Sequence, residues 1–413
     1  MQLVITKVKT NAFSRESAFD VKYVTLICAL FYILIFGRSL SNLFFYAFAG
    51  FSLAVFFLSN SKHCVSFLFF LLPFSSILKP SVGSISFFTL LFFFVVFKYV
   101  VIYRKFDAKL LFFSMIFLAY SVLFSGLGQL TAIISIIAGI LLIYYIREDR
   151  ADINSIIVPL SFGIFLSSVL ALLKEQLPII NAFVNDTMIK LGESNYELRF
   201  SGLQGNPNYY TLDIILVLAA IIVLISKKKT KPIHIVLMIS LSILGFMSLS
   251  KSFLLTWLLL IILWFIVSAK QGLTGLSKFV FICIIGVVLI YYFAYDSINS
   301  YIFRLFGSGA NSLDDVTTGR STIWEKYVNI LLNDLKILFF GNGINTISYD
   351  VGLGTHNTYL ESIFYLGIIG TTIFGITVTL AMGKINLKKF GWVPILVLLI
   401  RMFAINILTY ACS

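Results

Sequence analysis

Charged residues are scarce in this sequence. Asp, Glu, Lys and Arg make up 12% of the 413 residues, whereas soluble domains carry about 25%, so composition excludes an ordinary soluble globular protein. The hydrophobic fraction is 59%, and apolar runs of mostly 14 to 20 residues recur along the whole length. These runs predict a polytopic α-helical membrane protein. Stretches such as 87–101 do not alternate apolar with polar residues, which argues against a transmembrane β-barrel.

Cysteine motifs and nucleotide-binding motifs are also missing. The four cysteines form no CxxC pair, which argues against a disulfide framework and a cysteine-based metal site. No phosphate-binding glycine loop, dinucleotide fingerprint or Gly-x-Ser-x-Gly elbow occurs, so an ATP-driven machine is not expected. The pair Asp314-Asp315 lacks further ligands at metal-binding spacing and is interpreted as a solvated turn. We therefore expect no cofactor and no metal.

The apolar runs predict an all-α fold of 12–13 transmembrane helices. The first run lacks a small-residue cleavage site and is interpreted as a span rather than a signal peptide. Two runs are shorter than the usual ~17–25 residues, so the count stays open between twelve and thirteen. The candidate spans are 23–36, 39–58, 65–78, 84–103, 110–124, 130–146, 156–173, 208–226, 233–249, 252–268, 279–293, 362–381 and 392–408.

The net charge of +13 is explained by membrane topology rather than by nucleic-acid binding. With the N-terminus inside, the inner segments carry 19 basic and six acidic residues, whereas the outer segments are balanced. Basic residues gather on the cytoplasmic side of helical membrane proteins. Two long extracytoplasmic loops are therefore expected, at 174–207 and 294–357.

Both loops contain recognisable local signals. Gly202, Gly205 and the Asn-Pro pair near 206 predict a sharp bend before the span that starts at about 208. In the second loop, apolar residues recur at helical spacing from Trp324 to about 338. A capping box formed by Thr322 and Glu325 predicts the start of this helix, and Gly341 predicts its end. We expect one amphipathic helix on the outer membrane surface or over a cavity mouth.

Four residues in or beside the outer segments suggest chemistry. By this topology His356 is the only histidine outside, which makes it a candidate general base; it could instead merely cap the returning span. Arg199 and Arg320 could bind a pyrophosphate bidentately, or simply touch lipid phosphates or solvent. Lys251, in a short outer turn, is either a third phosphate contact or a snorkelling lysine.

Ionisable residues within the spans are candidates by default, because each costs about 2.5–3.5 kcal/mol at a helix centre. Asp213 and Glu361 lie in the first turns of spans that enter from outside, where they could orient Arg199 and His356. Lys98 and Arg401 receive no role from the sequence.

An ordered set of short motifs resembles the O-antigen ligase and O-antigen or capsular polysaccharide polymerase superfamily. The resemblance covers about residues 155–381, and the N-terminal half shares only its run of spans. Lys251 departs from the pattern, since arginine is commoner there. The motifs are Arg199-Phe200-Ser201-Gly202, Asn206-Pro207-Asn208, Ser250-Lys251-Ser252, Gly319-Arg320 with Trp324, Phe340-Gly341-Asn342-Gly343, His356-Asn357-Thr358-Tyr359 and Gly367-Ile368-Ile369-Gly370.

The resemblance implies a glycosyltransferase on the outer face of the bacterial cytoplasmic (inner) membrane. Its donor would be an oligosaccharide on undecaprenyl pyrophosphate, and its other partners would be membrane lipid, a flippase and a chain-length regulator. Arg199 and Arg320 would bind the pyrophosphate, and His356 would position or deprotonate the acceptor hydroxyl. The residues expected to bind substrate are Asn206, Asn208, Lys251, Trp324, Asn357 and Glu361.

Within the family, the stretch from Phe200 to Tyr209 is more similar to the polymerases of capsule and O-units than to ligases. A ligase transferring polysaccharide to lipid A–core or protein is the alternative, and an exporter of lipid-linked oligosaccharide is a third hypothesis. An exporter should carry more intramembrane charges. The expected organisation is N-terminal spans over 1–154, the ligase/polymerase-like core over 155–381 and a C-terminal span over 382–413.

Overall fold

The structure of the protein is a computed structural model that describes residues 20–81, 85–103, 107–149, 152–184, 187–191, 195–302, 320–344, 351, 354–383 and 392–402. Eight helices in this part of the chain are long and apolar enough to cross a membrane, and four further apolar helices are shorter. The protein is therefore a predominantly helical, multi-pass membrane protein.

The helices follow the predicted spans closely. The run expected at 23–36 extends to 20 residues and reaches spanning length. The run expected at 65–78 instead becomes an 11-residue helix followed by a 3-10 turn through Pro73. The helices are α2 (Val21–Leu40), α3 (Leu43–Leu58), α4 (Ser61–Leu71), η1 (Leu72–Phe74), α5 (Phe87–Tyr103), α6 (Ala108–Ser125), η2 (Leu127–Gln129), α7 (Leu130–Glu148), α8 (Asn154–Leu172), α10 (Pro207–Ser226), α11 (Pro232–Met247), α12 (Lys251–Ala269), α13 (Leu273–Ile302), α17 (Thr358–Met382) and α18 (Val393–Arg401).

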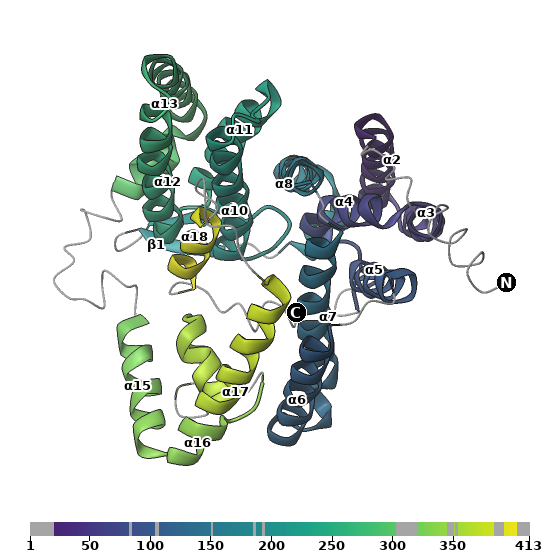
Figure 1. Ribbon diagram of the computed structural model, residues 1–413. Helices are drawn as coiled ribbons and strands as arrows, with labels where there is room; N and C mark the ends of the chain where they lie inside the picture. The colour runs from purple at the N-terminus through teal and green to yellow at the C-terminus, as the bar shows by residue number, and fades with distance from the viewer. Residues whose placement is uncertain are drawn as a thin grey trace.

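Two apolar cores hold these helices together. One core joins α2 to α7 with α17, and the other joins α10 to α13 with α18. Figure 1 shows α10 to α13 as a teal-to-green group, with α18 beside α10 and α17 packed along α6. Phe200 packs against both cores, so the chain at the end of the first expected loop lies where the two meet.

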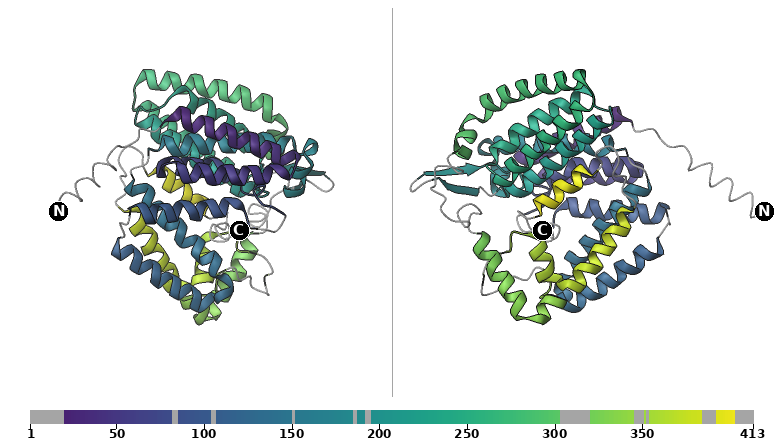
Figure 2. Two further views of the ribbon diagram at one scale, coloured as in Figure 1. Left: turned by 90° about the vertical axis from the view of Figure 1, so that its right-hand side faces the viewer. Right: turned by 60° about the vertical axis from the view of Figure 1, so that its left-hand side comes forward.

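The first expected loop, 174–207, is largely structured. It contains η3 (Lys174–Gln176), α9 (Pro178–Phe183) and an antiparallel hairpin of β1 (Thr187–Leu191) and β2 (Asn195–Arg199). The hairpin projects from the helical body in Figure 2. The all-α prediction therefore missed a pair of strands. Gly202 and Gly205 adopt φ of 56° and 68°, which confirms the bend predicted before α10.

The second expected loop, 294–357, also contains helices where it is described. Ala294 has non-helical dihedrals, but α13 continues beyond this kink to Ile302. The prediction of a single helix between Thr322 and Gly341 is wrong, because α15 (Arg320–Asn333) ends before α16 (Leu335–Phe340) begins. The Asp334 carboxylate accepts from the backbone N–H groups of residues 336 and 337 at 2.9 and 3.2 Å, so aspartate caps a new helix there. The capping box is wrong as well, since Arg320 is already helical.

A glycine junction, formed by Gly341, Gly343 and Gly367, fixes α16 against α17. Gly341 (φ 81°, ψ 171°) ends α16, and Gly367 (φ 64°, ψ 178°) kinks α17. Each would meet the other segment's backbone if it carried a Cβ atom. The N–H groups of residues 342 and 343 donate to the carbonyls of Phe364 and Tyr365 at 2.8 and 3.0 Å. The two glycine motifs therefore form one structural contact that sets the direction of the first half of α17.

Candidate functional site

Arg199 is the last residue of β2 and lies over the start of α10. The Phe200 N–H donates to the Met247 carbonyl at 3.2 Å, which ties this strand end to α11. The Arg199 guanidinium donates through Nε to the Ser248 carbonyl at 3.1 Å and through Nη2 toward Asn208 Oδ1 at 3.5 Å. The hairpin and the turn after it thus place Arg199 beside the first turn of α10.

Hydroxyl groups connect Asn208 to the start of α12. Ser250 Oγ donates to Asn208 Oδ1 at 2.9 Å and lies 3.0 Å from Ser252 Oγ. Lys251 stands between these serines as the first residue of α12. The Tyr301 hydroxyl, at the end of α13, donates to the Ser250 carbonyl at 3.1 Å. Four segments of the chain therefore converge on this short polar turn.

Arg401, the last residue of α18, completes this network from 149 to 193 positions away in the chain. Its side chain is fully buried, and Nη1 donates to Ser252 Oγ at 2.6 Å. Nη2 donates to the Asn208 carbonyl at 2.6 Å and to Thr211 Oγ1 at 2.8 Å. All these acceptors are neutral, Nε has no acceptor, and within the described residues Arg401 forms no salt bridge. A buried cation held only by neutral groups favours an anion nearby.

His356 approaches from the start of α17. It has φ of 49°, in the left-handed region that histidine tolerates better than most residues. Its neighbour Asn357 caps α17 by accepting from the N–H groups of residues 359 and 360 at 3.0 and 3.3 Å. Trp324 of α15 donates from Nε1 to the Thr355 carbonyl at 2.9 Å. α15 and the N-terminus of α17 thus fix the backbone on either side of His356.

Two contacts join the ends of α17 and α18. The Thr358 N–H donates to the Met402 carbonyl at 2.8 Å, and the Tyr359 hydroxyl donates to the Leu399 carbonyl at 2.9 Å. Arg320 interacts electrostatically with both His356 and Arg401. Arg199 and Arg401 both contact Asn208, Lys251 stands between Ser250 and Ser252 in the chain, and Arg320 is the residue that acts on both Arg401 and His356; we call these four residues the cation cluster.

The environment of His356 favours the neutral form of its imidazole. Part of the side chain remains exposed. Partial burial lowers the pKa of His356 below its ordinary value of 6.5, and the positive charge of Arg320 lowers this pKa further. A neutral imidazole can accept a proton from a hydroxyl group, which a protonated one cannot do.

The other predicted binding residues divide into two groups. Asn208 belongs to the network, Lys251 follows Ser250 in the chain as the first residue of α12, and Trp324 donates to the backbone next to His356. Asn206 and Asn357 serve mainly as helix caps, since the Asn206 side chain accepts from the N–H of residue 208 at 2.9 Å. Glu361 is fully buried in the first turn of α17, where the helix dipole favours a carboxylate.

Two intramembrane candidates have structural roles instead. Asp213 accepts a 2.6 Å hydrogen bond from Gln204, so it anchors the turn before α10, whereas the sequence suggested that it orients Arg199. Lys98 donates to the carbonyls of Phe56 and Phe57 at 2.7 and 3.2 Å, which places its charge at the C-terminus of α3. The Asp314-Asp315 pair lies outside the described residues.

Sequence reasoning left Arg401 without a role and did not single out Tyr301. Arg401 carried one signal, its charge within an apolar run. No group of three or more His, Cys, Asp or Glu side chains that could hold a metal occurs in the described part of the chain. Comparison with known proteins finds no matching family model, curated protein or solved structure.

Proposed function

We propose that the protein is a membrane glycosyltransferase that polymerises undecaprenyl-pyrophosphate-linked oligosaccharide repeat units into O-antigen or capsular polysaccharide. The observation that supports this best is the cation cluster beside a neutral histidine. Arginine forks suit the oxygens of a pyrophosphate, and a neutral imidazole suits an acceptor hydroxyl. The motif resemblance supplies the sugar substrate, and the geometry supplies compatible chemistry.

In the proposed step, an acceptor hydroxyl attacks the anomeric carbon of the donor sugar. The bond between this carbon and the pyrophosphate oxygen breaks as the new glycosidic bond forms. His356 takes the hydroxyl proton, and undecaprenyl pyrophosphate leaves with the bonding electron pair. Arg199 and Arg320 stabilise the charge that develops on the leaving group. Arg401 and Lys251 add to the positive potential at the pyrophosphate site, and Arg401 also holds Asn208 and Ser252 in place.

We place this reaction on the outer face of the bacterial cytoplasmic membrane. The charge bias of the connecting segments supports this orientation. In the proposed topology the shorter helices α3, α4, α5 and α11 cross together with the eight long ones, which gives twelve spans, or thirteen when α18 is also counted.

The test uses purified protein in liposomes with a synthetic undecaprenyl-pyrophosphate repeat unit, and the products are separated on a gel. We expect a polymer ladder from the wild type and none from His356→Gln. Arg320→Lys keeps the charge but loses the bidentate fork, so it should retain only part of the rate. A matched pair lies on α12: Lys251→Gln should slow polymerisation, whereas Lys270→Gln, an exposed residue at the other end of this helix, should not.

Other outcomes point to the alternatives. A ladder that survives both His356→Gln and Arg320→Lys at the full rate keeps the enzyme but removes these residues from its mechanism. No ladder, but a single transfer after lipid A–core is added, identifies a ligase. Movement of the lipid-linked sugar across the bilayer without any transfer identifies an exporter.

A further inference from the structure

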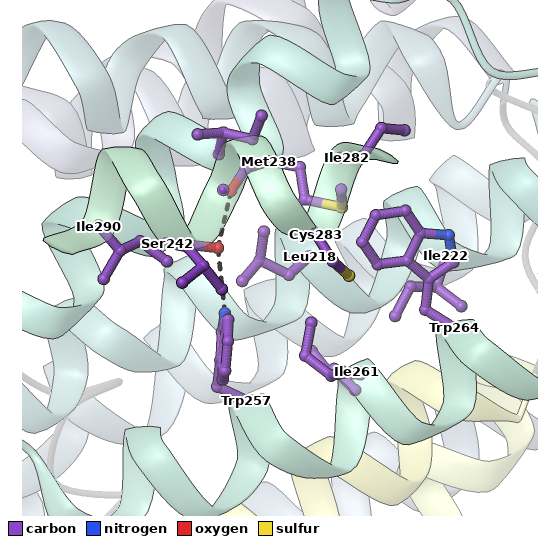
Figure 3. A pocket seen from close by; sticks show the side chains of 14 residues that line it. Leu218, Ile222, Met238, Ser242, Trp257, Ile261, Trp264, Ile282, Cys283 and Ile290 are labelled. Carbon is purple, nitrogen blue, oxygen red and sulfur yellow. Dashed lines mark hydrogen bonds between the residues drawn. The ribbon is translucent and has the colours of Figure 1, made fainter. Parts of the chain in front are cut away.

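An apolar cavity of about 220 Å³ lies among α10, α11, α12 and α13, away from the cation cluster. Figure 3 shows the side chains around it, among them Trp257, Trp264 and Cys283. The Trp257 indole N–H donates to Ser242 Oγ at 3.1 Å, and Ser242 donates to the Met238 carbonyl at 2.8 Å. Since these polar groups are paired with each other, the cavity offers little to hold water and suits a hydrocarbon ligand.

Two of the four helices that line the cavity, α12 and α13, also reach the cation cluster. Lys251 begins α12, and Trp257 and Trp264 follow six and thirteen residues later on this helix. At 1.5 Å per residue, these positions lie about 9 to 20 Å below Lys251 along the helix axis. α13 lines the cavity and then contributes Tyr301 to the turn at Ser250. A molecule with an anionic head at the cation cluster and a hydrocarbon chain could therefore occupy both places.

We propose that the cavity binds a segment of the polyisoprenoid chain of the lipid-linked donor. This inference rests on the proposed function, which places the donor pyrophosphate at the cation cluster. An engineered apolar cavity of about 150 Å³ holds benzene, so a cavity of 220 Å³ has room for roughly one to two isoprene units. The rest of the chain lies in the bilayer along α13, whose Phe281, Val288 and Tyr292 side chains are exposed.

The driving force is packing rather than transfer from water. A polyisoprenoid chain in the bilayer is already surrounded by hydrocarbon, so entering the cavity gains mainly dispersion contacts. The cavity should therefore help to select the donor chain and fix its register, with a moderate effect on affinity.

Gly286 offers a direct way to fill the cavity. It lines the cavity on α13, and a Cβ atom placed on it meets no heavy atom within 4 Å. Phenylalanine also has a higher helix propensity than glycine, so Gly286→Phe should fold. Gly139 on α7 is the matched control, because it is another partly buried helical glycine with open space around its Cβ position, and it does not line this cavity.

The experiment compares the wild type, Gly286→Phe and Gly139→Phe in liposomes. The probe is an undecaprenyl-pyrophosphate repeat unit with a diazirine within its isoprenoid chain, and cross-linked peptides are identified by mass spectrometry. We expect the wild type to cross-link within α10 to α13. Gly286→Phe should reduce this labelling severalfold and raise the KM for the full-length donor about three- to tenfold, with less change in kcat. Gly139→Phe should match the wild type.

The inference is overturned if Gly286→Phe labels and polymerises like Gly139→Phe, or if a diazirine-labelled phosphatidylethanolamine labels these helices and the isoprenoid probe does not. Wild-type protein that makes no polymer with any donor overturns the proposed function instead, because cross-linking reports occupancy of the cavity without turnover. The two failures are therefore separate.

Discussion

Replacing Gly367 by alanine tests the glycine junction between α16 and α17. With φ of 64° and ψ of 178°, Gly367 occupies a region that is essentially restricted to glycine. Forcing another residue there costs about 1–3 kcal/mol. The new methyl group would also overlap the Phe339 carbonyl oxygen, which must move away and weaken the two backbone hydrogen bonds of the junction.

We expect Gly367→Ala to lower the free energy of unfolding by about 2–4 kcal/mol, combining the backbone cost with partial loss of hydrogen bonds worth about 0.5–1.5 kcal/mol each. The control is Gly375→Ala in the same helix. Gly375 is exposed, and nothing lies within 4 Å of its Cβ position. Since alanine is the better helix former, this control should gain up to about 1 kcal/mol.

The measurement is equilibrium unfolding of the purified variants in mixed micelles of a mild detergent and dodecyl sulfate, followed by circular dichroism. The reasoning is refuted if Gly367→Ala and Gly375→Ala unfold at the same dodecyl sulfate fraction. A destabilised Gly367→Ala protein that still polymerises at the wild-type rate would show that the junction supports the fold without setting the position of His356.

Further predictions concern the charged residues. Arg320→Gln removes a positive charge beside His356, so the pKa of this histidine should rise toward 6.5. The assay is modification by diethyl pyrocarbonate, quantified on the His356 peptide: as the pH is lowered, the rate should fall to half at a higher pH than in the wild type. An unchanged midpoint contradicts this prediction. Arg401→Gln should reduce the kcat/KM of polymerisation at least about tenfold. Arg401→Lys should restore only part of this kcat/KM, because one ammonium group cannot replace the arginine fork that binds Ser252 and the α10 backbone. Full activity of Arg401→Lys contradicts this prediction. Lys98→Met should cost about 1–3 kcal/mol of unfolding free energy while leaving KM unchanged; an unaltered unfolding midpoint argues against the capping role.

The membrane-spanning helices could be predicted because runs of apolar residues mark where they lie. Their lengths were predicted less well, since the runs at 23–36 and 65–78 correspond to helices of 20 and 11 residues. The break between α15 and α16 could not be predicted, because the apolar residues keep their helical spacing across it. The break depends on one side chain, Asp334, which caps the new helix. The hairpin of β1 and β2 was missed for a related reason. Two five-residue strands give only a weak alternation signal beside long apolar runs.

The candidate site was predictable in its residue types but not in its assembly. Arg199, Arg320 and His356 were identified because each is a reactive group in a chain with few charges. Their relation depends on which helix ends meet, and sequence spacing does not determine this. Arg401 illustrates the limit: its charge within an apolar run suggested importance, but its hydrogen bonds reach across the chain to Thr211 and Ser252.

The position of Arg401 also determines when the polar network around Asn208 can be completed during synthesis of the protein. Its partner Thr211 lies 190 residues earlier in the chain. At about 5–20 residues per second, a ribosome needs about 10–40 s to cover this distance. During this interval α10 and α12 can already be inserted while the polar groups at their N-terminal ends still lack the arginine. Under the proposed function, a nascent chain is therefore expected to be inert toward lipid-linked sugar until α18 is inserted.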